Sequence, residues 1–413
     1  MAFGLTKTRY SPIAIDFGAD SLKLLQVVAA DPPQLVAAAS AVVPEHARQD
    51  PVARQAFFAD ALKSLLRAQP FRGKHAVVAL PAYSTLVQHL QIGRGQDDSI
   101  DDQIAIQLRQ RLNIDPSRMV VRHFRVGPVV RDGATREEVI CVASSRDSVM
   151  SLIQTANRAK LDVVGMSCEP LATLGAFAHL YRHAEDNGRT TCFLDIGAAT
   201  TKVLIAHGRE MVFAKTIHAA GDHLTRHRAG AQSLSFADAR ELRMREASEK
   251  AKAQPALATA GVAGVSAGSG ASGSESQDDG VGLAVLQAQL VAARVAAAIA
   301  ANASPQAAPS DGKPAGEDET IECLIDELQL CLRYHQAMYG GRPVEKLVFL
   351  GGEANHVATC QRIARALRIG AQLGDPLARV TKVTASQSPT GVDIRQPQPG
   401  WAVPLGLCLE KTS

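Results

Sequence analysis

Apolar residues recur along this chain in two patterns, and each pattern predicts a different secondary structure. Short uninterrupted apolar runs that stop at glycine or proline, such as residues 75–81, are typical of buried strands. Other stretches repeat an apolar residue at helical spacing. Ile100, Ile104, Leu108 and Leu112 would form one stripe along a helix. The two patterns alternate along the chain, so the sequence predicts an α/β fold.

The predicted elements form an ordered series. Strands are expected at residues 34–43, 75–81, 85–92, 120–126, 139–143, 161–166 and 344–350. Helices are expected at residues 53–67, 169–182, 235–249, 320–338 and 358–367, and two more begin after Ser99 and Ser145. A serine at either position can accept a hydrogen bond from the first turn of the helix that follows.

One short motif occurs twice in the chain. The copies span residues 15–24 and 194–203, and both read apolar, Asp, apolar, Gly, Ala, any residue, Ser or Thr, any residue, Lys, apolar. Two apolar runs joined by a turn with glycine are typical of a β-hairpin. The separation of the copies suits a duplicated half-domain rather than a short-period repeat.

The residue types of this motif favour phosphate binding. Glycine permits positive φ and lets backbone N–H groups approach an anion closely. Aspartate beside such a turn can hold Mg²⁺ through water, while hydroxyls reach phosphate oxygens. Two facing hairpins would therefore clamp a polyphosphate. Either copy alone could be an ordinary hairpin, but agreement at Asp, Gly, Ala, the hydroxyl and Lys favours the clamp.

Composition argues against several other classes of protein. The 413 residues carry a net charge of +3 and the basic residues are dispersed, so no nucleic-acid-binding surface is predicted. The seven cysteines form no C-x-x-C pair and several lie in apolar runs, which favours reduced core residues over disulfides or a zinc site. The length allows two or more hydrophobic cores.

Residues 281–303 are the one candidate for a membrane span. They are rich in alanine and interrupted by Gln287, Gln289 and Arg294, so a soluble helix is the preferred interpretation and no direct span is predicted. Residues 251–282 and 304–318 are rich in small residues or proline, and we expect them to be flexible loops around that helix.

The order of these motifs resembles the actin-like ATPase superfamily, which includes the cell-division protein FtsA, and within it the PilM family of type IV pilus assembly. The resemblance is carried by the two hairpins, residues 78–81, the helix from Ile100, residues 161–172, Gly221 with Asp222, residues 234–243, and the turn at Gly351 and Gly352. It implies two duplicated halves around a nucleotide cleft, with an FtsA-type small α+β subdomain inserted in the first half.

The resemblance also implies domain limits. The first half would comprise residues 1–80 and 165–190, with the inserted subdomain at 81–164 between them. The second half would comprise residues 191–250 and 319–413, with a low-complexity insertion at 251–318 between them.

By the same resemblance, ATP and Mg²⁺ are the expected cofactors. Asp16 and Asp195 would organise the metal. Glu169 and Asp195 would be the catalytic residues, with Glu169 polarising the attacking water. The nucleotide would be bound by Asp16, Gly18, Ser21, Lys23, Gly197, Thr200, Thr201, Gly221, Arg243, Gly351 and Gly352. Lys23 or Lys202 would neutralise phosphate charge or simply flank the sheet.

Three residues depart from the family's pattern on the adenosine side. Glu353 stands where a small residue is usual, Arg243 where lysine is common and Arg240 where an acid is common. A carboxylate at position 353 would either crowd the nucleotide or hydrogen-bond its ribose. The phosphate clamp is thus better preserved than the adenosine pocket, and we expect at most slow ATP hydrolysis.

The function implied by the resemblance is a cytoplasmic scaffold of type IV pilus assembly, peripheral to the inner membrane. It would bind the N-terminal tail of a PilN-like inner-membrane protein, and other pilus proteins or further copies of itself are possible partners. The tail would lie near residues 80–81 and 90–92. Leu86, Val87, Leu90 and Ile92 would contact it or face the insert's own core.

Three other functions are considered. A small-molecule kinase of the sugar type would need a catalytic base beyond the aspartates assigned to metal, and it would lack the insert. A heat-shock-type chaperone would need a peptide-binding domain after the core. An FtsA-like or secretion-system relative remains the third alternative.

Overall fold

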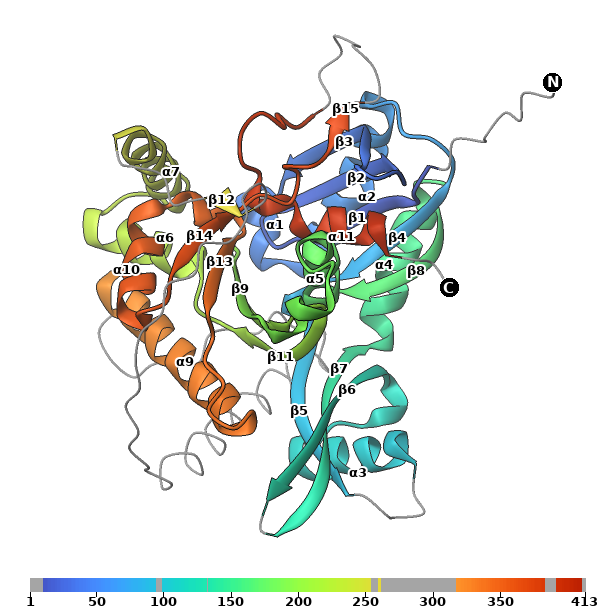
Figure 1. Ribbon diagram of the computed structural model, residues 1–413. Helices are drawn as coiled ribbons and strands as arrows, with labels where there is room; N and C mark the ends of the chain where they lie inside the picture. The colour runs from blue at the N-terminus through green and yellow to red at the C-terminus, as the bar shows by residue number, and fades with distance from the viewer. Residues whose placement is uncertain are drawn as a thin grey trace, which may run out of the picture.

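Two halves built on similar six-stranded sheets form the body of the molecule (Figure 1). The computed structural model describes residues 10–93, 99–131, 133–253, 259–260, 317–382 and 391–410. Most of the predicted low-complexity insertion, including the alanine-rich helix predicted at 281–303, lies outside the described residues.

The first sheet has the strand order β15-β3-β2-β1-β4-β8. Its strands are β1 (Ile13–Phe17), β2 (Ser21–Val28), β3 (Gln34–Val42), β4 (His75–Leu80), β8 (Asp162–Cys168) and β15 (Thr381–Lys382). β1, β2 and β3 form an antiparallel meander, and β4 and β8 then add in parallel.

The second sheet repeats this arrangement in the order β11-β10-β9-β13-β14-β12. Its strands are β9 (Thr190–Ile196), β10 (Thr201–His207), β11 (Glu210–Ile217), β12 (Thr259–Ala260), β13 (Lys346–Leu350) and β14 (Ala371–Gly374). β9, β10 and β11 are antiparallel, and β13 and β14 add in parallel. The shared order and directions support the duplication that the repeated motif predicts.

Helices cover both sheets. In the first half they are α1 (Glu45–Gln49), α2 (Pro51–Ala68), α4 (Arg146–Arg158), α5 (Glu169–Phe177) and α11 (Ala402–Leu409). In the second half they are α6 (Gly221–Gln232), α7 (Phe236–Ala253), α9 (Glu317–Met338) and α10 (Val357–Leu367). Short 3-10 helices are η1 (Ala82–Ser84), η2 (Pro116–Arg118), η3 (Ala178–Leu180), η4 (Ala184–Gly188), η5 (Gly352–Asn355) and η6 (Pro399–Trp401).

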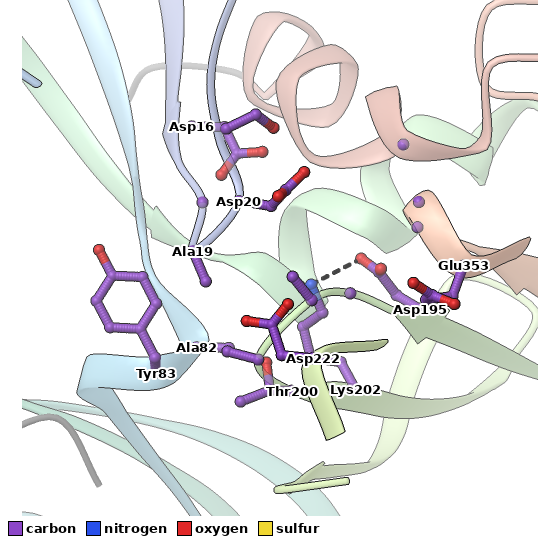
Figure 2. Close-up of a pocket in the computed structure, with 18 of the residues that line it drawn as sticks. Asp16, Ala19, Asp20, Ala82, Tyr83, Asp195, Thr200, Lys202, Asp222 and Glu353 are labelled. Carbon is purple, nitrogen blue, oxygen red and sulfur yellow. Dashed lines mark ion pairs between the residues drawn. The ribbon is translucent and has the colours of Figure 1, made fainter. Parts of the chain in front are cut away.

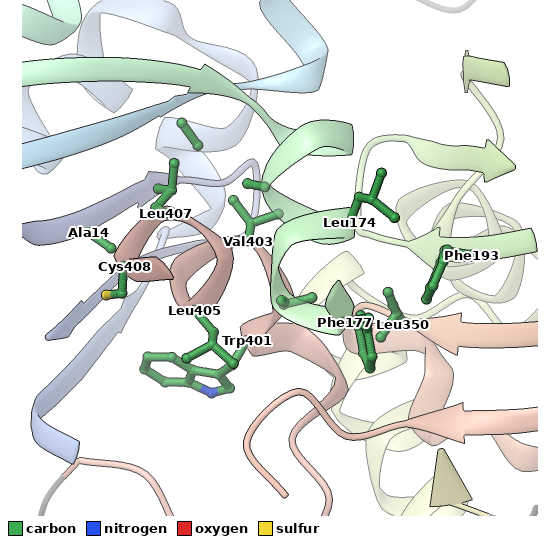
Figure 3. Close-up of a cluster of buried hydrophobic side chains, with 14 of the residues drawn as sticks. Ala14, Leu174, Phe177, Phe193, Leu350, Trp401, Val403, Leu405, Leu407 and Cys408 are labelled. Atoms are coloured by element: carbon green, nitrogen blue, oxygen red, sulfur yellow. The ribbon is translucent and has the colours of Figure 1, made fainter. Parts of the chain in front are cut away.

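Successive residues of a strand face opposite sides of its sheet, and here they enter different cores. Ile13 and Ile15 of β1 pack toward α2, whereas Ala14 packs toward α5 and α11. In β9, Leu194 joins the core of α6, α9 and α10, whereas Phe193 joins the same central core as Ala14. α5 and α11 therefore form a shared layer between the two sheets (Figure 3).

The inserted subdomain is a separate three-stranded sheet with one helix, at the bottom of Figure 1. It consists of β5 (Thr85–Gly93), β6 (Met119–Arg131), β7 (Ala134–Ser145) and α3 (Ile100–Leu112). The predicted caps form, because the Asp102 amide donates to the Ser99 hydroxyl and the Ser148 amide donates to the Ser145 hydroxyl.

The sheet of the insert ends at Ser145. α4 then packs against α2 and also against β6 and β7, and β8 pairs with β4 in the first sheet. The insert's predicted extent of 81–164 stays a prediction. Leu86, Leu90 and Ile92 are buried in the insert's core with α3. Of the two roles considered for these side chains, the structure supports core packing.

Among the described residues, no helix combines the length and the apolar character needed to cross a bilayer. The membrane-span candidate at 281–303 is not among those residues.

Candidate nucleotide cleft

The two glycine turns have matching geometry. In the first hairpin Asp16 lies opposite Lys23 across the strands, and in the second Asp195 lies opposite Lys202. Each turn is closed by the glycine amide, which donates to the Ser21 carbonyl at 3.1 Å in one copy and to the Thr200 carbonyl at 3.0 Å in the other. The repeated motif is therefore a repeated structure.

The two turns require glycine because other backbone atoms pass close to it. The expectation of a positive φ at these glycines is wrong. Neither Gly18 nor Gly197 has a positive φ. A Cβ on Gly18 would lie 2.9 Å from the Ser21 carbonyl oxygen, and one on Gly197 would lie 3.0 Å from the Thr200 oxygen. Any side chain would thus push the turn open.

Both turns line one cavity of about 130 Å³ between the halves (Figure 2). Ten of the predicted site residues line it: Asp16, Gly18, Ser21, Lys23, Glu169, Asp195, Gly197, Thr200, Gly351 and Gly352. Thr201, Gly221 and Arg243 do not. The Thr201 side chain is fully buried and donates to the Ala219 carbonyl at 2.6 Å, on the opposite face of the strand from the cavity-lining Lys202.

Asp16 is a buried carboxyl, 8% exposed, at the end of β1. Burial raises its pKa to about 6, although the Lys23 ammonium opposes the shift. The Lys23 ammonium itself donates to the Gly400 carbonyl at 2.7 Å, which ties the first hairpin to the segment before α11. A cation beside Asp16 would favour its ionised form.

Lys202 lies between two carboxylates. Its ammonium is 2.9 Å from an Asp195 oxygen and 2.6 Å from an oxygen of Glu169. Burial alone would lower the pKa of Lys202, but these carboxylates raise it, so the side chain stays charged. The sequence predicts Lys202 only as an alternative to Lys23 for neutralising phosphate charge. In the structure Lys202 connects the second hairpin to α5 across the cleft.

Glu169, the predicted water-polarising residue, uses both of its oxygens. One accepts the Ala82 amide at 2.8 Å and the other accepts Lys202. In this arrangement the carboxylate holds the start of the insert and the cleft lysine together. The side chain reaches the cavity, but it is committed to protein partners.

Two of the three adenosine-side departures, Arg243 and Glu353, form a buried ion pair. The Arg243 guanidinium, 3% exposed, donates to Glu353 at 2.7 Å and 3.4 Å. The same guanidinium donates to the Gly221 carbonyl at 3.1 Å and to the Thr225 hydroxyl at 2.8 Å. A Cβ on Gly221 would lie 2.2 Å from a Glu353 oxygen, so only glycine fits beneath this carboxylate.

A second set of ion pairs joins residues from the two halves beside the cleft. Arg48 of α1 donates to Asp20 in the first hairpin and, at 3.1 Å, to Asp222 of α6, while Arg240 of α7 also donates to Asp20. We call Asp222, Arg48, Asp20 and Arg240 the cross-cleft chain. Its members come from both halves.

Sequence reasoning did not assign the cross-cleft chain to the site. Asp20 and Arg240 are 220 residues apart, and charged residues in separate elements have no local spacing signal. The one available hint was that the second copy of the motif has Ala199 where the first has Asp20. Among the described residues, no group of three or more His, Cys, Asp or Glu side chains is arranged as a preformed metal site.

Comparison with known proteins supports the fold. In solved structures, a "PilM-PilN type IV pilus biogenesis complex" matches with a TM-score of 0.67 at 19% identity, covering 97% of this chain and 98% of that one. The ethanolamine utilization protein EutJ from Carboxydothermus hydrogenoformans matches with a TM-score of 0.47 at 13% identity, covering 98% and 91%. The first of these shows the actin-like fold.

No curated protein sequence matches the chain. The family model described as "Type IV pilus assembly protein PilM" matches residues 14–253, which is more than half of the chain and includes both glycine hairpins and the insert. This protein therefore belongs to the PilM family of type IV pilus assembly proteins.

Proposed function

We propose that this protein is an ATP-binding and Mg²⁺-binding scaffold of type IV pilus assembly. The observation that carries the proposal is the pair of hairpins, which bring Asp16 with Lys23 and Asp195 with Lys202 to one cavity in matching register. Main-chain N–H groups of tight turns and lysine ammoniums are suited to phosphate oxygens.

The carboxylates fit a divalent cation. Asp16 is buried and its pKa is raised to about 6, mainly by that burial, so a nearby dication would stabilise the charged form. Asp16 and Asp195 would hold Mg²⁺ through water, and Ser21 and Thr200 would contact phosphate oxygens. Bound Mg²⁺ would supply charge neutralisation for the phosphates.

Hydrolysis is expected to be slow. Glu169 already accepts the Ala82 amide and the Lys202 ammonium, so its carboxylate is oriented by protein partners rather than by a water. A turnover number in the range of ordinary metabolic enzymes, on the order of 1–10³ s⁻¹, would argue for a kinase or an active ATPase instead.

Calorimetry of ATP and Mg²⁺ binding tests the clamp. Asp195→Asn removes a metal-organising charge, and we expect affinity to fall about tenfold or more, as for the loss of a charge-assisted contact. Asp162→Asn is the matched control, because this carboxylate is 71% exposed in β8, outside the cavity. Equal ATP affinity for wild type and Asp195→Asn would reject the clamp assignment.

The proposed partner is the cytoplasmic N-terminal segment of a PilN-like inner-membrane protein, through which the scaffold would work at that membrane. Support comes from family membership and from the neighbouring structure, whose title names PilM with PilN. Leu86, Leu90 and Ile92 are committed to the insert's core. We therefore place the peptide on the edge of the first sheet beside the insert.

β8 is the strand proposed to receive it. Among the described strands β8 pairs only with β4, and Val164 on it is 42% exposed. An extended peptide can add main-chain hydrogen bonds to such an edge.

Fluorescence anisotropy with N-terminal peptides of PilN-like proteins from the same genome tests this placement. We expect micromolar binding that Val164→Glu weakens about tenfold. Leu234→Glu, at an exposed apolar residue between α6 and α7, should leave it unchanged. If Val164→Glu leaves the peptide affinity unchanged, the binding site is not on β8. No binding of any peptide to folded protein would reject the partner.

A further inference from the structure

The wall of the cavity at the turn after β13 is polar but carries no net charge. Glu353 lines the cavity there, and its charge is balanced by Arg243 at 2.7 Å. A lone carboxylate in this position would repel a nucleotide's phosphates, whereas a paired one presents hydrogen-bond acceptors without a net negative field. This chemistry suits an uncharged, hydroxyl-bearing part of a ligand.

The carboxylate is held in a fixed orientation. Arg243 is itself anchored by the Gly221 carbonyl and the Thr225 hydroxyl, and the Glu353 stem packs directly over Gly221. Glu353 is nevertheless 12% exposed. Part of the carboxylate therefore faces the cavity while the rest is braced from behind.

The position along the cavity agrees with this chemistry. Figure 2 shows Glu353 on the same side as Asp195, across from Asp16 and Asp20. Beside Gly352, a Cβ would find no atom within 4 Å, so there is open space next to the Glu353 wall. A phosphate chain held by the hairpins would direct the remainder of the nucleotide toward this space.

We propose that Glu353, braced by Arg243, is the specificity-determining residue that accepts hydrogen bonds from the ribose hydroxyls, so that the site selects ribonucleotides over deoxyribonucleotides. This rests on the proposed nucleotide site. An ionised carboxylate offers about four lone-pair positions. Arg243 takes two of them, and His356 Nε2 lies 3.5 Å from Glu353 Oε2. The remaining positions can accept a cis-diol, the same use that dinucleotide-binding folds make of an acidic side chain.

Calorimetric titration of the full chain with ATP, 2′-deoxy-ATP and inorganic tripolyphosphate, each with Mg²⁺, tests the proposal. Wild type should bind ATP about tenfold or more tightly than 2′-deoxy-ATP, the range for a hydrogen bond to a charged group. Glu353→Gln should reduce this ratio to nearly one, mostly by weakening ATP. The control Glu246→Gln removes a carboxylate that pairs with Arg228 between α6 and α7, outside the cavity, and should keep the ratio.

Glu353→Gln leaves Arg243 buried without its counter-charge and could fail to fold. The double variant Glu353→Gln with Arg243→Gln removes both charges and should show the same loss of ribose preference. The ratio of ATP affinity to 2′-deoxy-ATP affinity measured on wild type is a sufficient test by itself. ATP and 2′-deoxy-ATP binding equally tightly to wild type would overturn the ribose assignment while leaving the clamp intact.

Tighter ATP binding by Glu353→Gln than by wild type would show that Glu353 crowds the nucleoside, which also overturns the inference. Tripolyphosphate binding without ATP binding would do the same. If neither compound binds, the proposed nucleotide site itself fails.

Discussion

At the scale of single residues, the cleft depends on charges that neutralise one another inside the protein. Lys202 offsets two carboxylates, Arg243 offsets Glu353 and Arg48 offsets Asp20 and Asp222. Desolvation makes each such charge costly if its partner is removed, so these residues are coupled in a way that surface ion pairs are not.

Lys202→Met is predicted to destabilise the protein by about 3 kcal/mol, since it leaves Asp195 and Glu169 as uncompensated neighbours in the cleft. Lys215→Met is the matched control. It removes a lysine from β11 whose partner Glu327 is 36% exposed, and it should cost less than about 1 kcal/mol. Urea denaturation of both variants checks the difference, and equal losses would show that the cleft lysine has no special role.

A buried histidine pair determines a pH dependence. Arg342 can only donate to His207 Nδ1, so His207 carries its proton on Nε2 and donates it to His335 Nε2 at 2.9 Å. Burial lowers the pKa of His207 to about 4, with Arg342 adding to the effect, and burial likewise lowers the pKa of His335 to about 4. Both rings are therefore neutral near pH 7.

Between about pH 4 and pH 6.5 the unfolded chain binds more protons at these histidines than the folded chain does. Their contribution therefore makes stability rise with pH across that window, with no penalty above it. We predict that, between pH 4.5 and 6.5, the melting temperature of His335→Gln rises less than that of wild type. Parallel melting curves across that window would contradict the assignment.

At the scale of secondary-structure elements, helix contacts place the shared central layer. α11 lies against α5 because Gly406 allows the two backbones to approach (Figure 3). A Cβ at Gly406 would lie 1.7 Å from the Ala172 carbonyl oxygen, which belongs to α5. The apolar segment predicted near the end of the chain is thus a buried helix, and a glycine determines how closely it docks.

Gly406→Ala is predicted to destabilise the protein by about 1–3 kcal/mol or more, because the helices must separate or shift. Gly230→Ala makes the same substitution in α6, where no atom lies within 4 Å of the added Cβ. It should instead stabilise by up to about 1 kcal/mol through helix propensity. Thermal melts of the two variants should move in opposite directions, and a tolerated Gly406→Ala would mean that the docking is loose.

At the scale of the whole molecule, the cross-cleft chain holds the two halves together over a small cavity. Arg48 contacts Asp222 and Arg240 contacts Asp20, each pair joining the first half to the second. Asp20, Asp222 and Arg240 line the cavity of about 130 Å³, so movement of the halves apart would enlarge the space available to a ligand.

The double variant Asp222→Ala with Arg240→Ala is predicted to favour an open cleft. It removes both pairs by which the cross-cleft chain joins the halves, while the Arg48–Asp20 pair within the first half is kept. Small-angle scattering of the ligand-free variant should give a larger radius of gyration than wild type. The control Arg228→Ala with Glu246→Ala removes an ion pair within the second half and should not change it. Identical scattering from all three proteins would indicate that the chain does not restrain the halves.

Local features of the protein could be predicted from the sequence alone. The two hairpins, the stripe of α3 and the caps at Ser99 and Ser145 follow from residues close together in the chain. Such features depend on turn chemistry, side-chain periodicity and hydrogen bonds within one turn of helix, all of which are encoded by adjacent residues. The part of the candidate site formed by the two hairpins belongs to this class.

Only the tertiary structure decided which distant residues meet. Arg243 and Glu353 are 110 residues apart, and their pairing turned two separate departures from the family pattern into one neutral wall. Thr200 faces the cavity while its neighbour Thr201 is buried on the other side, since the strand begins there and successive side chains alternate. Long-range packing and desolvation determine such partners, and no spacing within the sequence carries that information.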